Sequence, residues 1–500
     1  MLLTSPSRLL ARSLSSRMAH GFFWAALLAQ FDALPLCLAQ SVTPTTQIPA
    51  PRAPLARPLP PPSQQEYWAQ FDHQDWSAAI ASAGQMVAAA RQATPPDTFR
   101  LASALTLLGN AQLNAQSPVT AEASFTEALK LVDPHVNGAD PRLLEPLRGL
   151  GYALAAESRH EQAIPYLERS LIVSRRNAGL FDISQQGVLR QLAVSETVLG
   201  RPSDGERYMT YLLRVGEHAY GGSDPRIVPI LCLVGDWYAE IGQMAPARES
   251  YRAALAAIGK KLGPLDLGVV EPLRAAASSY IREVNLSSYG IRSQTDYFAG
   301  GTQVEPRLPT SADGTSSEGQ AMNPRYLSAD GEKALLLAIK ALDAHENRST
   351  QTLIDTLLQT GDWFVFKQQF DKALPYYKRA WETIGTLPKD ALRPGEDPMG
   401  FPVQVYYPTP VLATRNLNRP ATEVEDRFVQ VEFTVKPDGS VKDARVVDQN
   451  GTARQTSQTL QAIGDSRYRP KFVAGEPVET AAMSYRQSFK QRVEKDKETE

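Results

Sequence analysis

Apolar residues follow two different spacings along this chain. From residue 63 to residue 386 they recur every three or four positions, which is the spacing of one face of an amphipathic helix. Near the C-terminus, Val429, Val431 and Phe433 alternate with polar residues, and alternation places one set of side chains on one face of a strand. The pattern therefore predicts a mainly α chain that ends in a small α+β domain.

The helical region repeats with a period of 42 residues. A small residue recurs at this step in the first helix of each unit, a second small residue follows twelve positions later, and a large residue follows four positions after that. A small residue lets two helices approach closely and the large one fills the space between them, so we expect helix hairpins that stack into a solenoid. The three series are Gly109, Gly151, Ala193 and Gly235; Ala121, Ala163, Gly205 and Ala247; and Phe125, Leu167, Met209 and Tyr251.

Aspartates mark the start of each unit at the same period. Asp140 and Asp224 each precede a proline, and Asp182 and Asp266 complete the series. An aspartate followed by proline is typical of a helix N-cap with proline at the first helical position. We expect the first helix of each unit to begin there.

The units at both ends of the array are incomplete or interrupted. Residues 75–87 supply only a second helix in register, and residues 271–284 supply a fifth first helix. The matching second helix comes late, at 331–345, after a polar insert rich in Gly, Ser and Pro at about 286–327 that we expect to be a loop or disordered. The last unit, 357–385, carries Gly361, Ala373, Tyr377 and Ala380 in the expected positions.

These small and large positions resemble those of the tetratricopeptide repeat (TPR), in the long-helix variety found in kinesin light chains. The resemblance covers roughly residues 63–386. It implies an α-solenoid that binds a protein or peptide along the face lined by its first helices.

One row of residues on those first helices is the candidate binding groove. Arg148, Arg190 and Arg274 occupy equivalent positions, with Cys232 in the fourth copy. Stacked guanidinium groups can hold an acidic peptide or a terminal carboxylate. Alternatively, Arg148 and Arg274 form ordinary surface pairs with the glutamates three residues before them. The neighbouring positions carry Asn110, Asn114, Tyr152, Asp236 and Glu240.

A strand-rich unit follows a linker rich in Pro and Gly. Two alternating segments flank the turn Pro437-Asp438-Gly439, residues 452–466 fit a helix, and residues 478–491 fit a third strand. The predicted order is β-β-α-β, which gives the hairpin the core that it lacks alone.

The unit resembles the C-terminal domain of TonB-type energy transducers. The resemblance rests on Tyr407-Pro408, on the stretch 433–451, on Arg467-Tyr468-Arg469-Pro470 and on Gly475–Val478. It implies a periplasmic domain of a Gram-negative bacterium that adds a strand from an outer-membrane transporter, or another envelope protein, to an open sheet edge near Ser484–Phe489. The signature residues are Pro437, Asp438, Gly439, Arg467, Tyr468 and Pro470.

The N-terminus predicts export. Arg8, Arg12 and Arg17 precede an apolar run at 21–41, and cleavage is expected after Ala39. The alternative is an uncleaved anchor in the inner membrane. The predicted order is a signal peptide (1–39), a Pro-rich tether (40–62), the TPR solenoid (63–386) with its flexible insert, a linker (387–410), the TonB-like domain (411–492) and a charged tail (493–500).

Composition narrows the classes of function. The net charge of −2 gives no basis for nucleic-acid binding, and six scattered histidines and two cysteines form no metal-ligand or catalytic motif. We expect no cofactor and no catalytic activity. The sequence predicts a periplasmic protein-binding adaptor; an inner-membrane energy transducer and a structural scaffold of an envelope complex are the alternatives.

Overall fold

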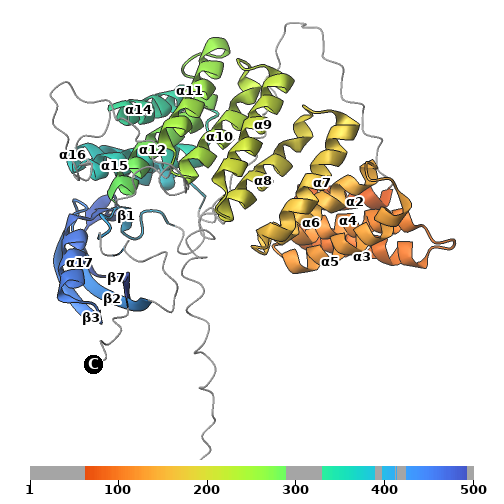
Figure 1. The fold of residues 1–500 in the computed structure, drawn as a ribbon. Coiled ribbons are helices and arrows are strands. Elements are labelled where there is room, and N and C mark those ends of the chain that lie inside the picture. Colours follow the sequence, from red (N-terminus) through yellow and green to blue (C-terminus); the bar gives the residue numbers. More distant parts are fainter. Residues whose placement is uncertain (1–61, 289–328, 389–396, 411–412, 414–423, 493–500) are drawn as a thin grey trace, which may run out of the picture. The chain divides into compact units, whose positions relative to one another are not determined.

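The computed structural model describes residues 62–288, 329–388, 397–410, 413 and 424–492. The predicted signal peptide, most of the tether, most of the insert and the charged tail lie outside these ranges. Within them the chain forms helix pairs followed by a small strand-rich domain (Figure 1). The pairs are α2 (Pro62–Asp72) and α3 (Trp76–Gln92), α4 (Thr98–Asn114) and α5 (Pro118–Val132), α6 (Leu144–Ala156) and α7 (His160–Ala178), α8 (Gln186–Val198) and α9 (Pro202–Tyr220), α10 (Val228–Glu240) and α11 (Met244–Lys261), α12 (Val270–Ser288) and α14 (Ala329–Asp343), and α15 (Thr350–Phe366) and α16 (Phe370–Ile384).

The pairs stack as the repeat predicts. In each pair the two helices pack together, and the second helix also packs against the first helix of the next pair. The first helices also meet one another, α4 with α6, α6 with α8, α10 with α12 and α12 with α15. The predicted helical repeat array is confirmed.

The alternation of small and large residues explains this packing. Phe125, Leu167, Met209 and Tyr251 are all at most 2% exposed. A methyl group added at Gly151 would lie 2.5 Å from the Leu167 side chain, closer than any van der Waals contact. Glycine at this position is therefore needed for the two helices of the pair to approach closely.

The helix starts differ from the prediction. Asp140, Asp182, Asp224 and Asp266 each cap a short 3₁₀ turn, accepting a hydrogen bond from the backbone N–H two residues later. The α-helices begin four residues after the aspartates, for example at Leu144. The side chain caps as expected, but it caps a tighter turn that leads into the helix.

The first unit of the array is a complete helix pair, although the sequence pattern revealed only its second helix. The helix α2 pairs with α3, and its Tyr67 is fully buried and donates a hydrogen bond to the Leu107 carbonyl at 2.8 Å. Tyr67 lies one period before Gly109, where the other units carry a small residue, so the repeat pattern does not reveal this helix.

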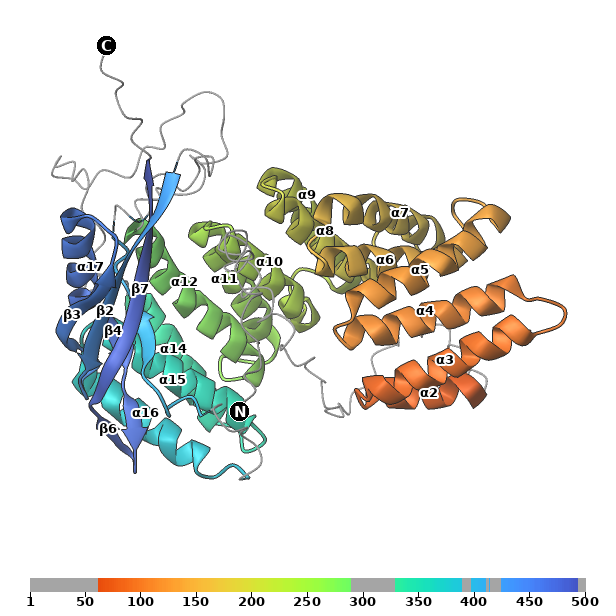
Figure 2. The same cartoon turned by 90° about the horizontal axis from the view of Figure 1, so that it is seen from below.

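The C-terminal domain has the predicted β-β-α-β order with short strands added (Figure 2). Its antiparallel sheet has the strand order β3-β2-β7, and α17 packs against β2 and β3. Val429, Val431 and Phe433 form the core with Ile463 of α17 and Phe489 of β7. Two further antiparallel pairs, β1 with β4 and β5 with β6, lie beside it. The elements are β1 (Val403–Tyr406), β2 (Val424–Val435), β3 (Val441–Gln449), α17 (Ala453–Asp465), β4 (Arg467–Arg469), β5 (Lys471–Val473), β6 (Glu476–Val478) and β7 (Thr480–Arg492).

Candidate functional site

The arginines of the candidate groove have partners within the chain. Arg148 donates to Glu145 at 2.5 Å, and Arg274 donates to Glu271 at 3.4 Å. Both are the i,i+3 pairs of the alternative interpretation. Arg274 also donates to the Gln359 side chain of α15 at 3.0 Å, so it ties two first helices together. With 31% and 21% of their side chains exposed, Arg148 and Arg274 are positioned by the fold and still reach solvent.

Tyr152 lies within the electrostatic influence of two arginines of the row. Burial raises the pKa of its hydroxyl to about 12, while the positive charges of Arg148 and Arg190 oppose that rise. The three side chains therefore lie close enough to share one electrostatic environment. Asn114, in contrast, donates to the Asn110 carbonyl within α4 at 2.8 Å, and no described contact connects these asparagines to the arginines.

Two carboxylates lie one helical turn apart on α10. The Asp236 carboxylate accepts a hydrogen bond from Tyr251 at 2.7 Å. Burial raises the pKa of Asp236 to about 6, and burial together with the charge of Asp236 raises the pKa of Glu240 to about 7. Arg282 and Arg190 are the positive charges that face both carboxylates. Desolvated carboxylates of this kind favour a cationic ligand.

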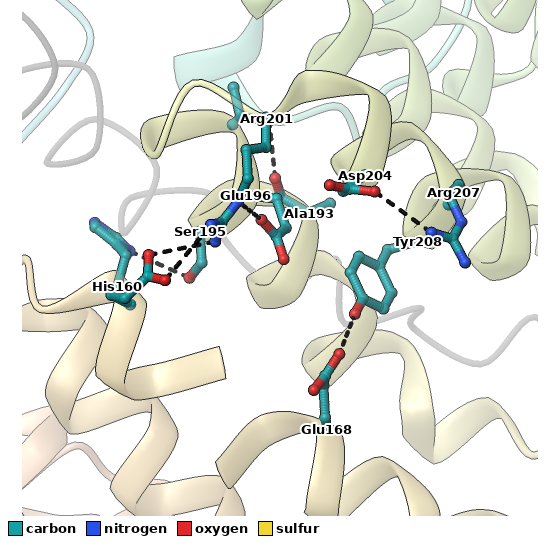
Figure 3. Close-up of polar contacts among 11 residues, drawn as sticks. His160, Glu168, Ala193, Ser195, Glu196, Arg201, Asp204, Arg207 and Tyr208 are labelled. Atoms are coloured by element: carbon teal, nitrogen blue, oxygen red, sulfur yellow. Dashed lines mark hydrogen bonds and ion pairs between the residues drawn. The ribbon is translucent and has the colours of Figure 1, made fainter. Parts of the chain in front are cut away.

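Polar contacts between α7, α8 and α9 are structural (Figure 3). His160 Nδ1 lies 3.2 Å from Ser195 Oγ, and Tyr208 donates to Glu168 at 2.8 Å. His160 is 4% exposed and Ser195 is fully buried, and burial lowers the pKa of His160. A serine hydroxyl that solvent does not reach is also closed to substrate, so this pair joins two repeats rather than forming a nucleophile and base.

The signature residues of the C-terminal domain meet each other. The Tyr468 N–H donates to the Gly439 carbonyl at 2.9 Å, and a methyl group on Gly439 would lie 2.1 Å from the Tyr468 oxygen. The Asp438 carboxylate accepts from the Ser440 N–H at 2.9 Å and so closes the turn. The side chain of Arg467 donates to the Ser466 carbonyl at 2.7 Å. These residues hold the turn of the hairpin against β4.

Arg469 belongs to the Arg467–Pro470 stretch that carries the resemblance, and it connects the C-terminal domain to the last helix pair, a contact that the sequence did not predict. Its guanidinium donates from Nε at 2.9 Å and from Nη2 at 2.5 Å to the two oxygens of Asp362 on α15. Tyr377 on α16 donates to the same carboxylate at 2.7 Å. Only 10% of the Arg469 side chain and 20% of the Asp362 side chain are exposed. Phe472 extends the contact, since it packs into the apolar core of the last helix pairs.

The strand β7 is an edge strand with regular alternation. It pairs with β2, and no other described strand is hydrogen-bonded to it. Gln487 and Phe489 are buried, whereas Ser484, Arg486 and Ser488 are exposed. Among the described residues, the edge predicted at Ser484–Phe489 therefore has no second strand paired with it.

Two further features bear on function. No group of three or more His, Cys, Asp or Glu residues within the described ranges is arranged to hold a metal ion. None of the helices in the described ranges combines the length and the apolar character that crossing a membrane requires.

Residues 428–490 match the family described as Gram-negative bacterial TonB protein C-terminal. The TonB-like domain is thus confirmed by sequence, at the position that the hairpin and the Arg467–Pro470 stretch predicted. No curated protein sequence is significantly similar to the chain.

Several solved structures align with the helical array. BtubC from P. vanneervenii is 18% identical, with 47% of this chain and 96% of that chain covered and a TM-score of 0.34. The quorum sensor NprR from B. thuringiensis is 10% identical, with 64% and 86% covered and a TM-score of 0.34. A TPR repeat-containing protein from Cytophaga hutchinsonii is 10% identical, with 66% and 99% covered and a TM-score of 0.33.

Proposed function

We propose that this protein is a non-catalytic adaptor of the Gram-negative cell envelope. Its helical array captures a protein or peptide, and its C-terminal domain binds an envelope protein, such as an outer-membrane transporter, by accepting an added strand. The observation that carries the proposal is the position of β7 at the edge of the described sheet, in a domain that matches the TonB C-terminal family. The row of arginines and carboxylates on the first helices supports the capture of a ligand by the array.

Strand addition requires that the partner lie along β7. A photo-crosslinking residue at Ser484, Arg486 or Ser488 places the reactive group on exposed positions of that strand. The control is Val447 on β3, which is 47% exposed and lies on the opposite edge of the same sheet. We expect the positions on β7, and not Val447, to crosslink in cells to an extended N-terminal segment of an outer-membrane protein. Equal crosslinking at both edges, or none at β7, would refute strand addition.

The alternative is an energy transducer anchored in the inner membrane. The contact of Arg469 with Asp362 favours the adaptor, because a transducer of the usual plan joins its terminal domain to the membrane through an extended spacer, whereas here the domain packs on a folded array. Fractionation of cells and sequencing of the mature N-terminus distinguish the two. A chain that begins at Gln40 in the soluble periplasmic fraction supports the adaptor, and an intact Met1 form in the inner membrane supports the transducer.

A further inference from the structure

Two repeats of the array carry the same trio of residues. Gly235, Asp236 and Tyr251 on α10 and α11 lie two helix pairs before Gly361, Asp362 and Tyr377 on α15 and α16. In both copies the tyrosine hydroxyl donates to the aspartate Oδ1 at 2.7 Å. In both copies the tyrosine ring also packs on the glycine so closely that a methyl group there would lie within 2.5 Å of it. The two sites are therefore built on the same local geometry.

In the later copy, the group that binds to the aspartate is a side chain of the same protein. Arg469 arrives from the C-terminal domain and forms two parallel hydrogen bonds with Asp362, and its guanidinium lies 6.0 Å from the centre of the Tyr377 ring. The tyrosine occupies one lone pair of Oδ1 and leaves both carboxylate oxygens able to accept from the planar fork of an arginine. The trio is thus a cradle for a guanidinium presented by another segment.

In the earlier copy, no arginine from the described part of the C-terminal domain is hydrogen-bonded to the aspartate. The hydrogen bond described for Asp236 is the one from Tyr251. The charged groups that face the site are Glu240 on the same helix, Glu271 and Arg282 on α12, and Arg190 on α8. Glu240 takes the place of Phe366, so this copy has a second carboxylate where the later copy is apolar.

We infer that Asp236, Glu240 and Tyr251 form a binding site for an arginine side chain presented by a protein partner of the array. This inference rests on the proposed function and names the chemistry that the partner must carry. Arginine fits better than lysine, because two carboxylates one turn apart match a rigid fork of donors and not a single ammonium group. Burial disfavours the charged form of both carboxylates and so raises their pKa values. A bound cation would stabilise the charged form, which supports a cationic ligand at this site.

The probe is a blocked peptide that copies residues 467–473, Arg-Tyr-Arg-Pro-Lys-Phe-Val, because this segment delivers Arg469 to Asp362. A second peptide carries citrulline at the position of Arg469, which keeps the shape and removes the charge. Binding to the full chain is measured by calorimetry at pH 8. The variants are Asp236→Asn and Glu240→Gln, and the matched control is Glu249→Gln, an exposed carboxylate on the neighbouring helix α11.

We expect Asp236→Asn and Glu240→Gln each to weaken binding of the arginine peptide at least about tenfold and Glu249→Gln to leave it within about twofold. Citrulline should weaken binding to the original chain by a similar factor and have little further effect on Asp236→Asn. Equal affinity of the original chain and Asp236→Asn, or no binding of the arginine peptide at millimolar concentration, would overturn the inference. Crosslinking at β7 does not involve Asp236. A negative crosslinking result would therefore refute strand addition without affecting the arginine site, and a negative peptide-binding result would refute the arginine site without affecting strand addition.

Discussion

The ion pair between Arg469 and Asp362 should be the main polar determinant of how firmly the C-terminal domain is held on the last helix pair. Both side chains are largely buried, and the pair is bidentate and supported by Tyr377. Removing one partner leaves a buried charge uncompensated, which in proteins costs about 3–5 kcal/mol. Because a tenth and a fifth of the two side chains still reach solvent, we expect about 2–3 kcal/mol for Asp362→Asn or Arg469→Met alone.

The double variant distinguishes a coupled pair from two independent residues. Asp362→Asn combined with Arg469→Met leaves no unpaired charge, so we expect it to cost about as much as one single variant rather than the sum. The coupling free energy should then be about 2 kcal/mol.

Hydrogen exchange followed by mass spectrometry measures this locally. The Phe472 N–H, which donates to the Met399 carbonyl at 2.9 Å, reports on the junction, and the amides of α6 serve as an internal reference. The matched control is Arg379→Met, which removes an ion pair to Asp343 whose side chains are 38% and 40% exposed, and we expect it to cost less than about 1 kcal/mol. Costs of Asp362→Asn and Arg469→Met that add to within about 0.5 kcal/mol would refute the coupling.

Two further predictions concern the repeats themselves. Glu240→Gln should stabilise the full chain at pH 8 and much less at pH 4. The pKa of Glu240 is raised from 4.5 to about 7, so the protonated group stabilises the fold below pH 4.5, and this stability is lost between pH 4.5 and about pH 7. Since each pKa unit corresponds to about 1.4 kcal/mol and the site is partly solvated, we expect a gain of about 1–2 kcal/mol in urea unfolding at pH 8, and an equal gain at both pH values would contradict this cause. Gly361→Ala should destabilise the last helix pair by about 1–3 kcal/mol, because the added methyl group would lie 2.2 Å from the buried Tyr377 ring. Thermal unfolding measures this effect, and Gly84→Ala on α3, where nothing lies within 4 Å, should be neutral or stabilising.

The helical array was predictable because its determinants are local and repeated. A glycine or alanine opposite Phe125, Leu167 or Tyr251 decides how closely two adjacent helices pack. Because the same pattern of small and large residues recurs in successive copies, few folds other than stacked helix pairs are compatible with it. The hairpin around Gly439 was predictable for a similar reason, since alternation and a turn residue with positive φ act over a few residues. The helix α2 escaped prediction because Tyr67 breaks the pattern of small residues and is stabilised by contacts with α3 and α4.

The sequence by itself therefore determined the repeat, its register and the identity of the terminal domain, and the tertiary structure decided which charges meet. Arg148 and Arg274 were recognisable as a row, but only the fold shows that each is paired with a glutamate and that Arg274 also reaches Gln359. Arg469 and Asp362 lie 107 residues apart, and nothing local to either predicts the other. The strength of an ion pair depends on the distance between the charges and on their burial. For Arg469 and Asp362, both are set only when the C-terminal domain packs against the helical array.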